Sequence, residues 1–154
     1  MKKILSIILV LLFITTILYA KTYREDFESK KSIKEFFGMK DPGNYFVLRS
    51  NYLENNCVLF GYQDGKRYTI KWVQFKKKGI IQNKKWHTLK VVVNRSIVKS
   101  YFNKMKLMEI DFSKGITGKR RKFRARFFLS KGKVGLWSKA DSKTYFDDFT
   151  VKVK

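Results

Sequence analysis

The stretch Gly132-Lys-Val-Gly-Leu-Trp-Ser-Lys-Ala-Asp-Ser-Lys-Thr-Tyr-Phe-Asp-Asp-Phe-Thr-Val-Lys-Val-Lys154 contains two extended runs separated by a turn. In the second run, Phe149, Val151 and Val153 alternate with polar residues. A period of two is typical of a β-strand that buries one face. We therefore expect residues 133–138 and 144–153 to form a hairpin that closes an all-β fold.

Asp147 has the same parity as these apolar residues, so the pattern places its carboxylate toward the core. A buried charge without a partner is very costly. We therefore expect Asp147 to be held by hydrogen-bond donors, by a cation or by a structural Ca²⁺ ion, because calcium prefers oxygen ligands. No organic cofactor is expected.

Residues 44–51 form a second alternating segment with two distinct faces. Phe46 and Leu48 share one face, whereas Tyr45, Arg49 and Asn51 share the other. An aromatic ring beside planar polar groups is what a sugar-binding surface requires, because rings stack on sugars and polar groups bond their hydroxyls. The alternative is a polar network on a solvated sheet.

Further strands follow along the chain. Asp64-Gly65 predicts a tight hairpin between residues 57–63 and 66–75. In the returning strand, Trp72 is either a core residue, which is the favoured interpretation, or a second stacking platform for a ligand. Residues 23–28 and 86–93 also predict strands, the latter with Leu89, Val91 and Val93 inward. Residues 97–102 and 105–112 predict a further hairpin with Asn103-Lys104 between its strands, and residues 30–40 predict a short helical turn or a loop. We interpret His87 as a hydrogen-bonded structural residue.

The first 20 residues have the parts of a secretory signal peptide: Lys2 and Lys3, an apolar run over residues 4–18, and Ala20. We expect a signal helix over residues 1–20, cleavage after Ala20, and a single domain over residues 21–154 of a secreted or periplasmic protein. The alternative is a retained membrane anchor, although the run is short for a bilayer span. Cys57 is the single cysteine, which excludes an intramolecular disulfide.

The chain is strongly basic, with a formal net charge of +23. Such an excess attracts polyanions, for example lipopolysaccharide or nucleic acid. The densest group is predicted to form a polyanion-contact surface on an alternating segment over residues 121–129; it comprises Lys119, Arg120, Arg121, Lys122, Arg124 and Arg126. The alternative is a lysine-rich composition with no binding role.

Three motifs occur in order: Asp41-Pro-Gly-Asn-Tyr-Phe-Val-Leu-Arg-Ser-Asn51, Trp86-His-Thr-Leu-Lys-Val-Val-Val93, and the stretch that begins at Gly132. Over roughly residues 41–153 the chain resembles the concanavalin A-like lectin/glucanase sandwiches of bacterial exported proteins, in particular laminin-G-like and keto-disaccharide-hydrolase-type domains. The resemblance implies a jelly-roll sandwich of two antiparallel sheets that binds carbohydrate. The short basic link after Asp26-Phe27 implies an N-terminally shortened sandwich, and residues 113–126 are a basic insertion.

Glu109 and Asp111 resemble the start of the carboxylate-bearing strand of laminarinase-type glycoside hydrolases. Ser113 and Lys114 stand where that strand needs its general acid. We therefore interpret Glu109 and Asp111 as surface groups and favour a non-catalytic, lectin-like domain for an anionic or cell-envelope glycan. The alternatives are a glycoside-processing enzyme, a binder of lipopolysaccharide or nucleic acid, and a truncated sandwich completed by self-association.

Overall fold

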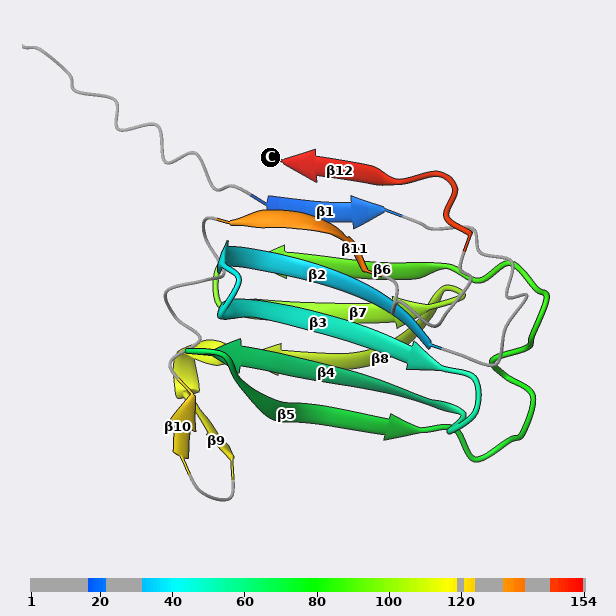
Figure 1. Ribbon diagram of the computed structural model, residues 1–154, viewed down its shortest axis with the longest axis horizontal. Helices are drawn as coiled ribbons and strands as arrows, with labels where there is room; N and C mark the ends of the chain where they lie inside the picture. Colours follow the sequence, from blue (N-terminus) through cyan, green and yellow to red (C-terminus); the bar gives the residue numbers. More distant parts are fainter. Residues whose placement is uncertain (1–16, 22–31, 119–120, 124–131, 138–144, 154) are drawn as a thin grey trace, which may run out of the picture.

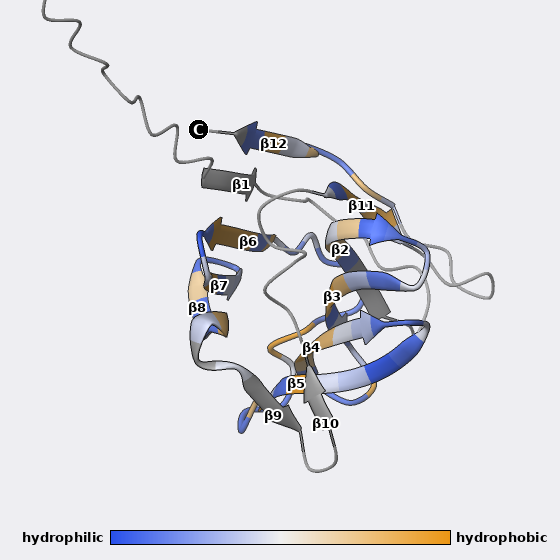
Figure 2. Cartoon of the chain, turned by 90° about the vertical axis from the view of Figure 1, so that its left-hand side faces the viewer, coloured by the Kyte–Doolittle hydropathy of each residue, from blue (hydrophilic) through white to orange (hydrophobic). Residues whose placement is uncertain are grey.

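The chain folds into two antiparallel β-sheets that pack face to face (Figures 1 and 2). The computed structural model describes residues 17–21, 32–118, 121–123, 132–137 and 145–153. The first sheet has the strand order β12-β1-β6-β7-β8, formed by Thr150–Val153, Ile17–Lys21, Leu89–Asn94, Ile97–Phe102 and Met105–Asp111. The second sheet has the order β11-β2-β3-β4-β5, formed by Lys133–Trp137, Ser32–Asp41, Asn44–Asn51, Asn56–Gln63 and Lys66–Gln74.

One helical turn and a small β-hairpin follow β8 in the chain. The 3-10 turn η1 (Phe112–Lys114) is succeeded by β9 (Ile116–Gly118) and β10 (Arg121–Phe123), which pair with each other. Within the described ranges, no helix is long and apolar enough to span a bilayer. The predicted fold class, an all-β sandwich of two antiparallel sheets, is confirmed.

The core lies between the two sheets and is built by alternation along each strand. Residues of even parity on β3 and of odd parity on β6 point inward, as predicted. The buried residues of this core include Phe37, Phe46, Leu48, Cys57, Leu59, Leu89, Val91, Val93, Val98 and Phe102. Burial of this apolar surface provides the main driving force that holds the two layers together.

Two hairpins have the tight turns that the sequence predicts. Asp64 and Gly65, between β4 and β5, have φ of 52° and 73°. Asn103 and Lys104, between β7 and β8, have φ of 46° and 71°. Two consecutive positive φ values are characteristic of a type I′ turn, whose twist matches that of the flanking strands.

The predicted C-terminal hairpin is wrong. β11 pairs with β2 in the second sheet, whereas β12 pairs with β1 in the first sheet, so the two strands belong to opposite layers. β12 is also shorter than predicted, because it begins at Thr150. The alternation along a strand indicates which face is buried, but it does not identify the neighbouring strand.

The prediction of a helical turn or loop over residues 30–40 is also wrong, because β2 occupies this segment. Phe37 points into the core on the same parity as Glu35, and both side chains are buried. A carboxylate at an inward position breaks the apolar period of two. The sequence pattern therefore conceals a central strand of the second sheet.

β1 lies between β12 and β6, where Leu18 is opposite Val153 on one side and Val93 on the other (Figure 1). The predicted first strand, residues 23–28, lies outside the described residues. β1 also spans the predicted cleavage point after Ala20, so residues 17–20 form a strand rather than the end of a signal helix. Residues 1–16 lie outside the described part of the chain, and cleavage itself stays a prediction.

Candidate functional site

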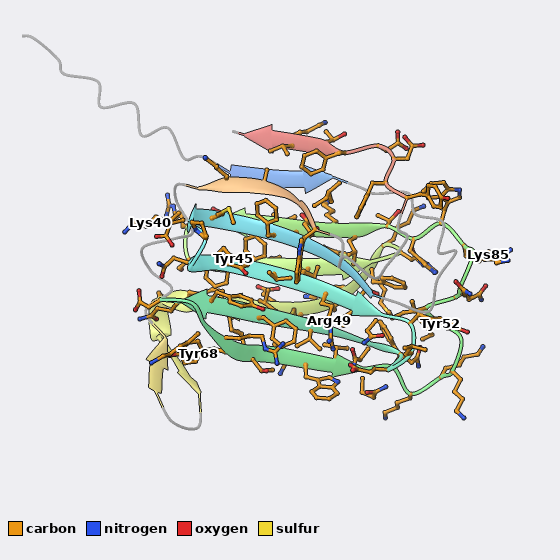
Figure 3. The ribbon with its side chains drawn as sticks, in the orientation of Figure 1. Lys40, Tyr45, Arg49, Tyr52, Tyr68 and Lys85 are labelled. Atoms are coloured by element: carbon orange, nitrogen blue, oxygen red, sulfur yellow. The ribbon has the colours of Figure 1, made fainter. Side chains whose placement is uncertain are left out.

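The second sheet presents an aromatic and cationic surface on the side that faces away from the first sheet; we call it the outer face. Strand pairing arranges its side chains in three rows across β3, β4 and β5. The rows are Tyr45–Tyr62–Arg67, Val47–Phe60–Thr69 and Arg49–Val58–Trp72. Tyr45 and Arg49 are both drawn on this face of β3 in Figure 3.

An apolar floor occupies the centre of the outer face. Val47, Val58 and Phe60 are buried there, apart from the main core, and Phe36 of β2 packs against them. Phe36 lies over Gly135 of β11, where any Cβ atom would overlap the phenyl ring. The glycine therefore lets the ring lie flat on the sheet.

Tyr45 and Tyr62 form a stacked pair at one end of this floor. Their ring centroids are 4.4 Å apart and their planes differ by 6°. Partial burial, followed by the proximity of Tyr62, raises the pKa of the Tyr45 hydroxyl. The pair is a fixed two-ring platform with a hydroxyl on each ring, and it remains half-buried rather than fully covered.

Two guanidinium groups lie over the ring of Phe60. The Cζ atom of Arg49 is 5.3 Å from the ring centroid and that of Arg67 is 5.0 Å from it. A cation over an aromatic face is attracted by the negative charge of the ring face. Phe60 of β4 therefore positions both arginines on the outer face. Arg49 belongs to β3, on one side of β4, and Arg67 belongs to β5, on the other side.

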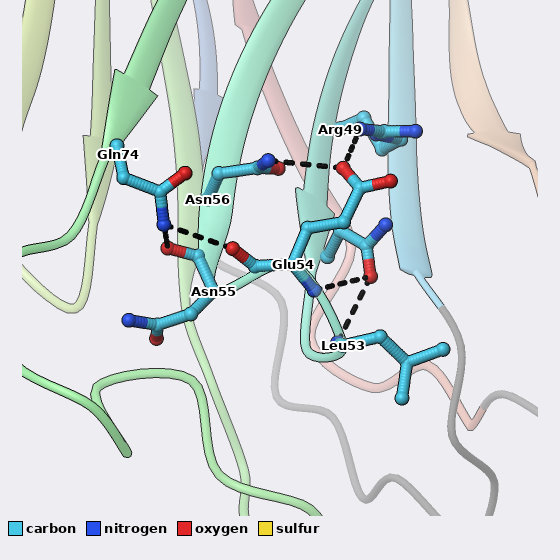
Figure 4. A network of polar contacts seen from close by, with 7 residues as sticks. Arg49, Leu53, Glu54, Asn55, Asn56 and Gln74 are labelled. Carbon is cyan, nitrogen blue, oxygen red and sulfur yellow. Dashed lines mark hydrogen bonds and ion pairs between the residues drawn. The ribbon is translucent and has the colours of Figure 1, made fainter.

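Arg49 is fixed by a polar network at the β3–β4 turn (Figure 4). Its Nη2 donates to Oε2 of Glu54 at 2.6 Å, and the same oxygen accepts from Nδ2 of Asn56 at 2.9 Å. Gln74 of β5 donates to the carbonyl oxygens of Glu54 and Asn55. The Arg49 charge is therefore compensated within the protein.

Asn51, predicted to contact a ligand, instead caps this turn. Its Oδ1 accepts hydrogen bonds from the backbone N–H groups of Leu53 at 3.0 Å and Glu54 at 3.4 Å. The side chain is buried. Such an Asx turn stabilises the chain reversal, so we assign Asn51 to the support of Arg49 and Glu54 rather than to the binding surface.

Trp72 is exposed, and the interpretation of this residue as part of the core is wrong. Its side chain is 56% exposed on β5, opposite Val58 of β4. β5 is the edge strand of the second sheet, and the indole lies on the outer face of that strand. The position suits the alternative interpretation, a stacking platform for a ligand.

Glu35 lies beneath this sheet, on the core side, and is 1% exposed. Neither carboxylate oxygen has a hydrogen-bond partner. Burial away from water penalises the charged form and raises the pKa of Glu35 from 4.5 to about 8. The carboxyl cannot reach the outer face, because its parity directs it between the sheets next to Leu48 of β3.

His87 is buried and hydrogen-bonded, as predicted for a structural residue. Its Nε2 contacts the backbone N–H and carbonyl oxygen of Gln82 at 3.0 and 2.9 Å, and its Nδ1 contacts Nδ2 of Asn103 at 2.9 Å. Burial lowers the pKa of the imidazole. Cys57 is a buried free thiol whose pKa is raised to about 12 by burial, so it behaves as a small apolar residue.

The predicted burial of Asp147 is wrong, because the side chain is exposed and its Oδ1 accepts from the backbone N–H of Asp148 at 2.8 Å. Among the residues that the structure describes, no three His, Cys, Asp or Glu side chains are grouped to hold a metal ion. Glu109 is exposed beside Lys106 and Lys99. Asp111 caps η1 by accepting from the N–H of Ser113, so both acids have local structural partners.

The basic group over residues 119–126 falls mostly outside the described part of the chain. Arg121 and Lys122 belong to β10, and the remaining four positions, Lys119, Arg120, Arg124 and Arg126, are not described. The polyanion-contact surface therefore stays a prediction.

Tyr62, Phe60 and Arg67 were not predicted as site residues from the sequence. The signal for them was available, because a two-residue turn at Asp64-Gly65 pairs Gln63 with Lys66 and therefore Tyr62 with Arg67. The parity of β4 then places Phe60 on the same face as Tyr62. The sequence does not predict that Arg49 and Arg67 both lie over the ring of Phe60, because this contact depends on the tertiary structure.

The chain has the fold of a concanavalin A-like β-sandwich. Among solved structures it is similar to the carbohydrate binding module CBM66 from Bacillus subtilis, with a TM-score of 0.65 and 15% identity over 90% of this chain and 75% of that chain. It is also similar to domains LG4-5 of the mouse laminin alpha1 chain, with a TM-score of 0.42 and 13% identity over 94% of this chain and 42% of that chain. No protein-family model and no curated protein matches the chain.

Proposed function

We propose that the protein is a non-catalytic carbohydrate-binding domain whose ligand lies on the outer face of the second sheet. The observation that carries this proposal is the combination of the Tyr45–Tyr62 platform, the exposed Trp72 and two guanidinium groups on one open sheet surface. Aromatic faces pack on the apolar sides of sugar rings, and guanidinium groups donate to oxygen acceptors in fixed directions. The similarity of the fold to a carbohydrate binding module supports the same proposal.

The composition of the face favours binding over catalysis. Glycoside hydrolysis of the usual kind uses two carboxyl groups on either side of the scissile bond. β3, β4 and β5 contain no Asp or Glu. Glu54, at the turn between β3 and β4, is engaged by Arg49.

We also propose that the protein is exported, on the basis of the basic start, the apolar run and Ala20 in the sequence. N-terminal sequencing of material secreted by expressing cells is expected to begin near Lys21. Recovery of an intact Met1 in the membrane fraction would support the retained anchor instead.

A glycan array probed at two salt concentrations tests the binding function. We expect a restricted set of glycans to bind at both concentrations, because stacking and directional hydrogen bonds persist when charges are screened. Binding to every polyanion at low salt, and to none at high salt, would favour the general polyanion binder. Release of free sugar from a bound glycan would favour the enzyme.

A further inference from the structure

The outer face contains two units that each combine an aromatic side chain with a guanidinium group. One unit consists of the tyrosine pair and Arg67, which lies directly opposite Tyr62. The other consists of Trp72 and Arg49, which lie in one row on either side of Val58. Tyr45 and Arg49 are four residues apart on β3, which corresponds to about 13 Å along the strand.

The two arginines differ in how their charge is compensated. Arg49 forms an ion pair with Glu54 at 2.6 Å. Arg67 is exposed and lies over the ring of Phe60; within the described residues it forms no ion pair. The outer face therefore has one uncompensated guanidinium group, located at the tyrosine end.

The acid nearest to Arg67 in the sequence is Asp64, at the β4–β5 turn, and no ion pair joins the two side chains. The three strands β3, β4 and β5 together contain no Asp or Glu. A guanidinium group that is held in place by a ring and lacks a counterion favours an anionic ligand group. A planar carboxylate matches the two parallel N–H donors of the fork.

We propose that the outer face binds an acidic polysaccharide through a carboxylate of a uronic-acid unit at Arg67, while a neighbouring sugar ring packs on Tyr45 and Tyr62. This inference rests on the proposed carbohydrate-binding function and specifies its ligand class. Among the described residues of this face, Arg67 has the one guanidinium group without an ion pair, so the site accommodates one carboxylate per bound segment. A densely sulfated chain would place further anionic groups over the apolar floor of Val47, Val58 and Phe60.

The arrangement also predicts recognition of the interior of a linear chain. The two aromatic units lie at opposite ends of a strip that runs along the strands, and the apolar floor connects them. A single terminal sugar would contact one unit only. We expect affinity to increase with oligomer length until both the tyrosine end and Trp72 are engaged.

The test uses calorimetric titration of the full chain with galacturonate, glucuronate and mannuronate oligomers, each paired with the same oligomer after reduction of its carboxyl groups. At least one acidic oligomer is expected to bind about tenfold more tightly than its neutral counterpart, as is typical for a charge-assisted hydrogen-bonded pair. Arg67→Gln is expected to abolish this preference. Arg67→Lys, which keeps the charge but lacks the fork, is expected to retain only part of it.

Lys71→Gln is the matched control. Lys71 is an exposed cation on the same strand, but it lies opposite Leu59, so its parity is that of the core side. This variant loses the same charge and is expected to keep the preference for the acidic oligomer. Equal losses in Arg67→Gln and Lys71→Gln would show that the attraction is general electrostatics and would overturn the inference.

Two further outcomes separate this inference from the proposed function. Equal binding of the acidic and reduced oligomers, with both weakened by Tyr45→Ala, would refute the role of Arg67 and retain carbohydrate binding at this face. Absence of binding by all acidic and all reduced oligomers would overturn both proposals. A thermal melt of each variant verifies that the domain is folded.

Discussion

Tyr45 and Tyr62 lie opposite each other on β3 and β4, with their rings almost parallel and their centroids 4.4 Å apart. Each ring restricts the rotation of the other, so the pair presents a fixed surface without the ordering cost of a free side chain. Substitutions of Tyr45 can distinguish the role of the ring, which stacks on Tyr62, from the role of the hydroxyl group.

Tyr45→Ala is expected to weaken glycan binding by about 1–2 kcal/mol, or roughly tenfold to thirtyfold, because one aromatic platform is lost. Tyr45→Phe keeps the ring and is expected to retain most of the affinity. Calorimetric titration with a glycan identified on the array measures both effects, and a thermal melt accompanies each variant. Unchanged affinity in Tyr45→Ala would place the ligand elsewhere, and an unfolded variant would show that Tyr45 is needed for the fold.

Glu35 is expected to make stability depend on pH. Its pKa is raised from 4.5 to about 8 in the folded protein, so the folded state binds more protons than the unfolded state between these values. The contribution of the protonated Glu35 carboxyl to the free energy of unfolding is fully present below pH 4.5 and is lost as the pH rises through about 8. Relative to Glu35→Gln, the wild type should lose about 1.4 kcal/mol of unfolding free energy per pH unit within this window.

Denaturant unfolding at several pH values measures the difference in unfolding free energy between wild type and Glu35→Gln. The titration of His87 does not affect this difference, because both proteins contain His87. Glu109→Gln is the control, since Glu109 is exposed and its pKa is lowered by Lys106 and Lys99. The difference in unfolding free energy between wild type and Glu109→Gln should show no such slope between pH 4.5 and 8, because both proteins keep Glu35. Parallel profiles for wild type and Glu35→Gln would mean that the Glu35 carboxyl reaches water.

Asp147→Ala is expected to change the unfolding free energy by less than about 0.5 kcal/mol, because the side chain is exposed. Asp111→Ala is expected to cost about 1 kcal/mol or more. In the folded protein, Oδ1 of Asp111 accepts from the N–H and Oγ of Ser113 and from Oγ of Ser96. A large loss in Asp147→Ala would restore the expectation that this carboxylate is buried.

A chain that begins at Lys21 is expected to melt at least about 5 °C below one that begins at Ile17. The shorter chain lacks four of the five residues of β1, which pairs with β12 and with β6. Without β1, backbone groups of both neighbours lose their partners. Equal melting temperatures would show that another segment fills this position in the cleaved protein.

The sequence by itself determined the local features of the fold. Alternation along residues 44–51 and 89–93 correctly separated the side chains that face the core between the sheets from those on the other face, because adjacent residues of a strand point to opposite faces. Asp64-Gly65 and Asn103-Lys104 predicted their hairpins, since Asp64, Gly65 and Asn103 are residue types that tolerate the positive φ values of such turns. The same parity placed Tyr45 and Arg49 together on one face.

Only the tertiary structure decided how distant strands pair and which outward residues form a site. The strands that contain Trp137 and Val151 are near in sequence but lie in different sheets, because pairing depends on the packing of whole layers. The buried Glu35 concealed β2, since a favourable overall core outweighs one costly inward carboxylate. Asn51 became a turn cap and Arg67 joined Arg49 over Phe60, because hydrogen bonds and ring contacts between strands form only when the sheet brings them together.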